Sequence, residues 1–130
     1  MFTFPFKVGP KKVGLRGQQL KYVARPYYAT KLSEADILNT IVRNYDGLNK
    51  GELFSALDAI VNEFRNHLFS GHPVKLMGLG TFRVSFNSES HDTPEGFTSK
   101  DIKNPRIIFI PDKGLREEMK KEIVFEEFVQ

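Results

Sequence analysis

The chain has 130 residues, of which 40% are hydrophobic and twelve are phenylalanine. This is enough apolar content for one packed domain with a structured extension, and it argues against disorder. The chain has no cysteine, which excludes disulfides, thiolate metal sites and thiol nucleophiles and suits a reducing cytoplasm. No apolar run approaches the ~20 residues that span a bilayer, and the first residues lack a signal-peptide pattern. We therefore expect a cytoplasmic protein without a membrane partner.

The net charge of +3 is unevenly distributed along the chain. Residues 1–31 contain seven Lys or Arg and no acidic residue, which gives +7, whereas residues 32–112 sum to −3 and residues 113–130 to −1. A polyanion is the simplest partner for so basic an N-terminal segment. A basic tail that only aids solubility is the alternative.

The first 31 residues predict two strands. Apolar side chains alternate with others from Phe2 to Val8, and Pro5 should confine this strand to a sheet edge or keep it short. The glycines and the proline between residues 9 and 17 predict a loop. Residues 20–25 predict a second strand, which Pro26 ends.

Two helices should follow. Ser33 and Asp36 form a capping pair for the first helix, which Asp46-Gly47 ends. Asn49 caps the second, with Glu52 at the capping-box position, and Ser70-Gly71-His72-Pro73 ends it. The second helix carries a wide face of large apolar residues at spacings of three and four, namely Leu53, Phe54, Leu57, Ile60, Val61, Phe64 and Leu68. A single subunit with a small sheet has limited means of covering this face.

Residues 74–86 predict a strand, a tight corner and a second strand. Gly78 and Gly80 should supply backbone torsions that side chains disfavour. In the second strand, Phe82 and its alternate neighbours should face a packed side, while Arg83 and its alternate neighbours face water.

The remaining chain predicts four further segments. Residues 87–105 are polar and turn-rich, with two lysines against four acidic residues. Residues 106–110 are apolar on both faces, which predicts a central, covered strand. Residues 113–121 predict a short helix, and residues 123–129 a terminal strand that pairs with the N-terminal segment.

Two blocks carry a family resemblance. Gly78-Leu79-Gly80-Thr81-Phe82-Arg83-Val84, and later Phe109-Ile110-Pro111-Asp112-Lys113-Gly114-Leu115-Arg116, resemble the signatures of the HU and integration-host-factor family of bacterial DNA-architectural proteins. The resemblance implies an α+β fold: a helical hairpin, a small antiparallel sheet with a β-arm, a C-terminal helix and an intertwined dimer. Residues 32–130 would form this domain, with the arm at about 87–105. Residues 1–31 would form a basic extension, expected to be β, as in longer HU-like variants.

The expected arm departs from the family. In HU it is basic and ends in an Arg-Asn-Pro tip whose proline wedges between base pairs, but here it is acidic and lacks that motif. Pro94 lies between Asp92-Thr93 and Glu95, which would bring negative charge toward phosphate, so we do not interpret it as a wedge.

No pattern of a catalytic or metal site occurs. The three histidines, His67, His72 and His91, lack metal-ligand spacing, and no Walker A, HExxH, GxSxG or EF-hand pattern is found. We expect no enzyme activity, cofactor, metal or small-molecule substrate.

The resemblance implies a homodimer that binds duplex DNA in the nucleoid through phosphate contacts, without reading bases. The basic residues that fit this role are Lys75, Arg83, Lys100, Lys103, Arg106, Lys113 and Arg116. Each of these residues taken singly is a solvated surface charge. Their assignment to DNA binding depends on a dimer, in which two copies of each residue would line a cationic hollow. Arg83 and Lys113 are the best candidates among them. The alternative is an HU-fold structural or protein-interaction module with little DNA affinity. A helix-turn-helix reader is less favoured, because neither helix begins with a polar face rich in Arg, Asn and Gln.

Overall fold

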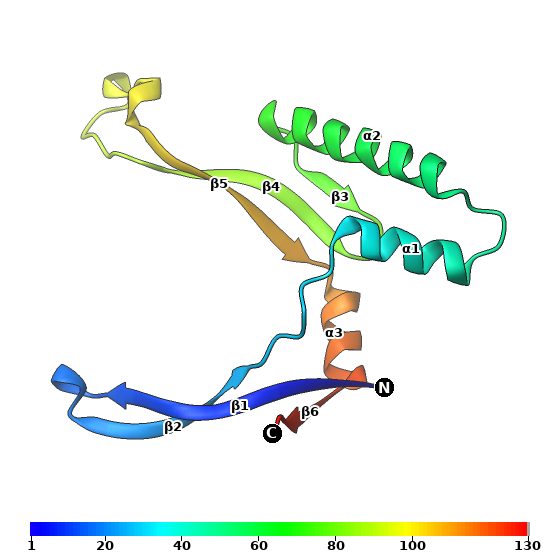
Figure 1. Cartoon of the computed structure of the whole chain (residues 1–130). Coiled ribbons are helices and arrows are strands. Elements are labelled where there is room, and N and C mark those ends of the chain that lie inside the picture. Colours follow the sequence, from blue (N-terminus) through cyan, green and yellow to red (C-terminus); the bar gives the residue numbers. More distant parts are fainter. Residues whose placement is uncertain (130) are drawn as a thin grey trace. The chain divides into compact units, whose positions relative to one another are not determined.

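The computed structural model describes residues 1–129, which form three α-helices and two three-stranded sheets (Figure 1). The chain is therefore α+β, as the sequence predicts. It divides into two compact units. One contains Met1–Ile37 and the chain from Glu117 onward, and the other contains Leu38–Arg116.

The first unit contains a sheet of strands β1 (Phe2–Val13), β2 (Gln19–Pro26) and β6 (Ile123–Glu127), in the order β2-β1-β6. Strand β2 pairs antiparallel with β1, and β6 pairs parallel with β1. The predicted pairing of the C-terminal strand with the N-terminal segment is thus confirmed. The hairpin turn between β1 and β2 is a short 3-10 segment (Leu15–Gly17).

Strand β1 corrects two predictions. It continues through Gly9 and Pro10, which we expected in a loop. It is also the middle strand, so the prediction that Pro5 confines it to an edge is wrong. The reason is that β6 pairs with residues 2–6 and β2 with residues 6–13, so most of β1 is paired on one side only. A proline in such a strand costs little pairing.

Helices α1 (Glu34–Asn44) and α2 (Lys50–Phe69) form where the capping signals place them. The Asp36 amide donates to Ser33 Oγ at 3.3 Å, and the Ser33 amide donates to Asp36 Oδ2 at 2.9 Å. These reciprocal bonds confirm the predicted capping box. The hydrogen bond from the Ser33 amide, followed by one from the Ser33 hydroxyl to Asp36 Oδ2 at 3.0 Å, holds the pKa of Asp36 below its ordinary value. At α2, the Glu52 amide donates to Asn49 Oδ1 at 3.2 Å.

The second unit contains a sheet of strands β3 (Val74–Leu76), β4 (Gly80–Ser88) and β5 (Ile102–Pro111), in the order β3-β4-β5. Both pairs are antiparallel, and β4 and β5 extend together as a two-stranded arm (Figure 1). Strand β5 is an edge strand in this chain, so the expectation of a central, covered position is wrong. Its apolar residues stay accessible, with Ile107 56% exposed.

The two glycines of the corner act differently. Gly78 has a φ of +79°, as predicted. Gly80 has no positive φ but is required by a close approach, because a Cβ there would lie 2.2 Å from the carbonyl oxygen of Ile110 on β5. The Asp112 amide donates to Leu79 O at 2.8 Å, which ties the start of helix α3 (Lys113–Glu122) to this corner.

Few side chains are buried in a single chain. Among the described residues, Leu38 and Leu68 are the only buried hydrophobic ones. The apolar face of α2 remains accessible, with Phe54 55% and Phe69 66% exposed. Within residues 1–129, no helix is long and apolar enough to cross a membrane.

Candidate nucleic-acid interface

Four predicted DNA-binding residues share one face of the β3-β4-β5 sheet. Residues that lie directly opposite each other on neighbouring strands point to the same side. Four such pairs follow one another along this face: Lys75 with Thr81, Arg83 with Ile108, Ser85 with Arg106, and Asn87 with Lys103. Lys75, Arg83, Lys103 and Arg106 are all exposed. The structure therefore brings together four of the seven cations.

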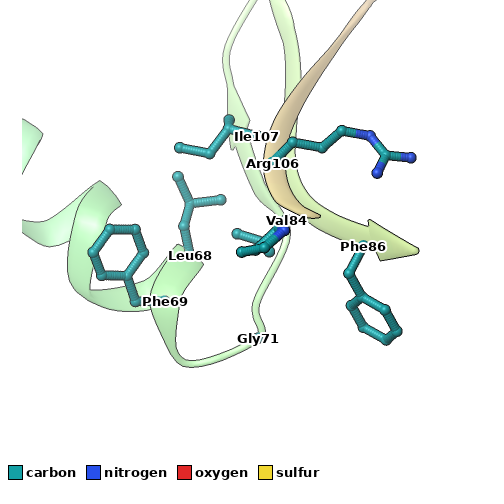
Figure 2. A pocket seen from close by; sticks show the side chains of 8 residues that line it. Leu68, Phe69, Gly71, Val84, Phe86, Arg106 and Ile107 are labelled. Carbon is teal, nitrogen blue, oxygen red and sulfur yellow. The ribbon is translucent and has the colours of Figure 1, made fainter. Parts of the chain in front are cut away.

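The other face of this sheet is apolar and is turned to α2. Phe82 is paired with Phe109, with ring centroids 4.8 Å apart, and Phe64 of α2 packs edge-on against Phe82 at 6.1 Å. Figure 2 shows Leu68 of α2 beside Val84 and Ile107, while the side chain of Arg106 extends away from the helix. The predicted alternation of a packed and a wet face is confirmed.

The cationic face contains no opposing charge along its strands. Residues 74–88 and 102–111 include four Lys or Arg and no Asp or Glu. Arg83 is the diagonal neighbour of Arg106 across the β4-β5 pair, a relation that spaces Cα atoms by roughly 7–8 Å. Such closely spaced cations raise the local positive potential and favour a polyanion.

A bulge in the arm fixes the direction of Arg106. The pairing register shifts between Ser85 and Asn87, and Asn104 on the opposite strand has a φ of +53°. Arg106 Nη1 donates to Asn87 Oδ1 at 3.0 Å and to Asn104 O at 3.4 Å. The guanidinium is held along the arm, and its remaining N–H groups stay available to an anion.

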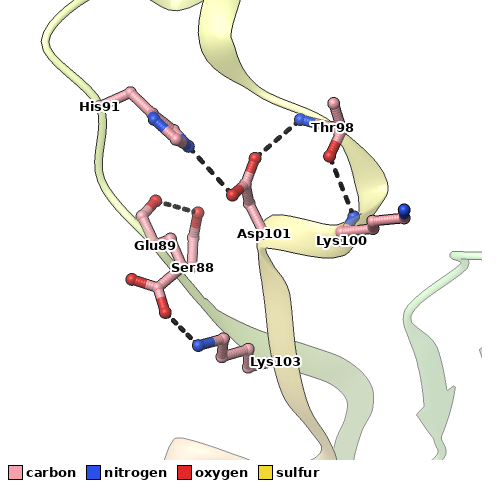
Figure 3. Close-up of polar contacts among 7 residues, drawn as sticks. All are labelled: Ser88, Glu89, His91, Thr98, Lys100, Asp101 and Lys103. Carbon is pink, nitrogen blue, oxygen red and sulfur yellow. Dashed lines mark hydrogen bonds and ion pairs between the residues drawn. The ribbon is translucent and has the colours of Figure 1, made fainter.

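The end of the arm, residues 89–101, has the opposite charge. It contains Glu89, Asp92, Glu95 and Asp101 against one cation, Lys100, which gives −3. Lys103 forms an ion pair with Glu89, so its charge is partly compensated (Figure 3). The predicted site residue Lys100 therefore lies in acidic surroundings.

Asp101 organises this acidic tip. The Thr98 amide donates to Asp101 Oδ2 at 2.8 Å, and His91 Nε2 lies 3.0 Å from Asp101 Oδ1 (Figure 3). The pKa of the Asp101 carboxyl is lowered below its ordinary value, chiefly by the hydrogen bond from the Thr98 amide and next by the hydrogen bond from His91. The Lys100 amide donates to Thr98 Oγ1 at 3.3 Å, which completes a capping box.

Sequence reasoning did not foresee this order in the tip. Two 3-10 turns, Pro94–Gly96 and Ser99–Asp101, occupy a segment that we expected only to be polar and turn-rich. The Thr98-x-x-Asp101 spacing was the available signal, since it follows the capping-box pattern. Pro94 lies at the start of the first of these turns.

The other two predicted residues lie on α3. Lys113 is its first residue, and the Arg116 amide donates to Asp112 O at 3.1 Å in the first turn. Both are exposed. The positive end of the helix dipole adds to their charge.

Within the described residues, no group of three or more His, Cys, Asp or Glu could hold a metal ion. His67 lies 3.2 Å from Glu63 one helical turn away, and its ring contacts that of His72.

Two consecutive helices and a small antiparallel sheet that extends into a two-stranded arm correspond to the HU-like fold that the sequence resemblance implies. The family model described as "HU domain fused to wHTH, Ig, or Glycine-rich motif" matches residues 4–127, and the chain belongs to this HU-HIG family. No curated protein matches the chain.

A crystal structure of a protein from Bacteroides vulgatus ATCC 8482, provisionally described as a bacterial DNA-binding protein, has a similar fold. The TM-score is 0.69 and the sequence identity 12%, over 98% of this chain and 49% of that chain. The chain thus spans about half the length of that protein, and the likeness at this identity supports the fold alone.

Proposed function

We propose that this protein is a dimeric, sequence-tolerant DNA-binding protein that acts on the chromosome as an architectural component of the nucleoid. The observation that carries the proposal is the acid-free cationic face of the β3-β4-β5 sheet. Membership of the HU-HIG family supports the same conclusion.

The chemistry of this face suits phosphates better than bases. Lys75, Arg83 and Arg106 lie on the strand surface without a set of Asn, Gln or acidic side chains that could read base edges, and such isolated cations contact phosphate oxygens. Guanidinium and ammonium groups gain affinity by releasing counterions from the duplex, whatever its sequence. Lys113 and Arg116 at the start of α3 would add phosphate contacts, because amides and cations there both favour an anion. Lys100 and Lys103, close to acidic groups, would contribute less.

A dimer is proposed because one chain leaves its apolar surface uncovered. Apolar side chains of α2 and the sheet line an open groove of about 560 Å³, which includes Ile60, Val61 and Ile107. A neighbouring hollow of about 800 Å³ shares Leu68, Phe69 and Ile107 with it (Figure 2). A second copy of the chain carries a matching apolar surface and would cover both hollows.

The large accessible surface of the chain also supports a second copy of the chain as the partner that covers these hollows. It measures 11408 Å², whereas two separately compact units of these sizes would expose about 8,400 Å² together. The excess of roughly 3,000 Å² per chain, or about 6,000 Å² for two chains, lies at the upper end of the range that obligate dimers bury. Dimerisation would also double each cation of the proposed site.

Titration of the full chain with a duplex of mixed sequence at several salt concentrations tests the proposal. The logarithm of affinity should fall steeply with the logarithm of salt, by about 0.9 for each phosphate neutralised. The double variant Arg83→Ala, Arg106→Ala should reduce this slope by about 1.8 per chain. Arg43→Ala, Lys50→Ala removes the same charge from the helices and should leave the slope unchanged.

Absence of binding at low salt would refute DNA binding. Equal slopes for the two double variants would refute this face as the site while leaving DNA binding intact.

One observation favours a second function. The ordered acidic tip, held by Asp101, would repel phosphate and suits a basic protein surface instead. In this alternative the protein is an HU-fold interaction module with little DNA affinity. Titration of the wild-type chain with duplex DNA at low salt separates the two functions: binding with a steep salt slope supports the DNA-binding function, and little or no binding supports the module.

A further inference from the structure

The hairpin of β1 and β2 carries a second cationic face, formed by two rungs of like charge. Lys7 lies directly opposite Arg25, and Lys11 directly opposite Lys21, all on the same face of the first sheet. Directly opposed like charges destabilise a strand pair. An arrangement that weakens the hairpin by itself becomes favourable when an anion lies across both rungs.

No acidic residue of the hairpin compensates these charges, because residues 1–31 contain none. The acidic group that shares the face is Glu126 of β6, opposite Pro5 and therefore beyond the Lys7 end. Glu127 is paired with Phe6 and lies on the other face. Positive charge therefore dominates from the Lys7 rung to the turn.

The two rungs differ in how they are held. Lys7 Nζ lies 4.6 Å from the ring centroid of Tyr27 and 5.1 Å from that of Phe128, and the two rings stack on each other. The side chains of Lys11 and Lys21 are exposed and, within the described chain, form no hydrogen bond or ion pair. The second rung can therefore be changed without loss of an internal contact.

The turn extends the basic surface. Arg16 has a φ of +62°, a conformation that residues other than glycine rarely adopt, between Gly14 and Gly17, which also have positive φ. Leu15 beside it is 87% exposed. The turn thus presents another cation at the far end of the ribbon, at some cost in backbone strain.

The opposite face of the hairpin is mostly apolar. Phe6, Val8 and Pro10 lie there, paired with Pro26, Ala24 and Tyr22, and Lys12 opposite Leu20 is its one cation. The four charges of the two rungs therefore form a separate face that suits a hydrated polyanion. Duplex DNA is the hydrated polyanion that the proposed function already assigns to this protein.

We propose that the β1-β2 hairpin is a second DNA-binding arm, whose Lys7/Arg25 and Lys11/Lys21 rungs bind the phosphate backbone of duplex DNA. The rungs are four residues apart, or about 13 Å along the strands. Two rungs at this spacing suit the closely spaced phosphates of a DNA backbone better than they suit a single acidic side chain. This inference rests on the proposed function and adds a separate surface to it.

Salt-dependent titration of full-length Lys11→Gln, Lys21→Gln with duplex DNA tests the inference. The control is Lys12→Gln, Lys31→Gln, which removes the same charge from the same segment but not from this face. We expect the slope of log affinity against log salt to fall by about 1.8 per chain in the first variant and to stay near the wild-type value in the control. Circular dichroism melts of both proteins check that the fold is kept.

The outcomes separate this inference from the proposed function. If wild-type protein does not bind DNA, the proposed function fails and the inference with it. If wild-type protein binds and the Lys11, Lys21 variant keeps the full slope, the second arm alone is refuted. A variant that loses binding only to vesicles of anionic lipid, with its DNA slope unchanged, also overturns it in favour of a membrane surface.

Discussion

Replacement of Val61 by glutamate gives the most direct test of the dimer. Val61 lies in the middle of α2, is 55% exposed in a single chain and lines the open apolar groove. In a monomer, the carboxylate introduced by Val61→Glu would reach water and would lie four residues before Arg65, a favourable spacing. The stability of a monomer should therefore change by no more than about 0.5 kcal/mol.

In a dimer the same carboxylate would be covered. Loss of the buried part of the valine costs about 1 kcal/mol per copy, and burial of an unpaired polar group adds at least ~1–3 kcal/mol. Two copies give a dimer destabilised by at least ~4 kcal/mol, or roughly a thousandfold in its dissociation constant.

Analytical ultracentrifugation over a wide concentration range measures this effect. Ala59→Glu is the matched control, because residue 59 is two positions away on the same helix and on the side opposite the apolar stripe. We expect the control to remain dimeric and the Val61 variant to dissociate. A wild-type protein that is monomeric throughout, or two variants with equal dissociation constants, would refute the covered groove.

Two further predictions concern the sheet and the tip. Gly80→Ala should destabilise the protein by about 1–3 kcal/mol in urea unfolding, because its Cβ would lie 2.2 Å from Ile110 O. The control Gly114→Ala, which places a Cβ in open space on a helix, should be neutral or stabilising. An equal loss of unfolding free energy in both variants would contradict the steric argument. Because the pKa of Asp101 is lowered in the folded state, its stabilisation of the tip is complete above the ordinary value of 3.8 and is lost as the pH falls through the lower folded value. The amide resonance of Thr98 should therefore titrate below pH 3.8, and a midpoint at or above 3.8 would count against the contact.

Local signals in the sequence predicted most of the elements. Capping pairs such as Ser33 with Asp36 are satisfied within four residues, so the start of α1 could be predicted without knowledge of the rest of the fold. Apolar alternation likewise predicted the two faces of β4. These are short-range properties, and the sequence displays them directly.

Errors arose where a residue depends on a distant neighbour. Pro5 is tolerated in the middle strand because the pairing of β6 and β2 with β1 scarcely overlaps, which the sequence of β1 cannot reveal. Gly80 is needed because Ile110, thirty residues later, approaches its backbone. Strand β5 is apolar on both faces but lies at an edge, because a sequence pattern does not say which chain covers a strand.

The residues of the candidate site could be predicted from the sequence, but the face of the sheet that they share could not. Lys75, Arg83 and Arg106 belong to three strands, and only the pairing register places them on one face. The same register joins Lys11 to Lys21 in the other sheet.

The distribution of charge between the two hairpins connects the two proposals. The β4-β5 arm is basic along its strands and acidic at its tip, residues 89–101, whereas the β1-β2 hairpin has no acidic residue from its first residue through its turn. Acidic groups at the end of an arm oppose contact with a phosphate backbone at that end. A protein that binds DNA with such an arm would need cations on another surface to contact further phosphates, and residues 1–31 contain seven Lys or Arg. We therefore expect variants of the two cationic faces to reduce the salt slope independently, with the double loss equal to the sum of the single ones.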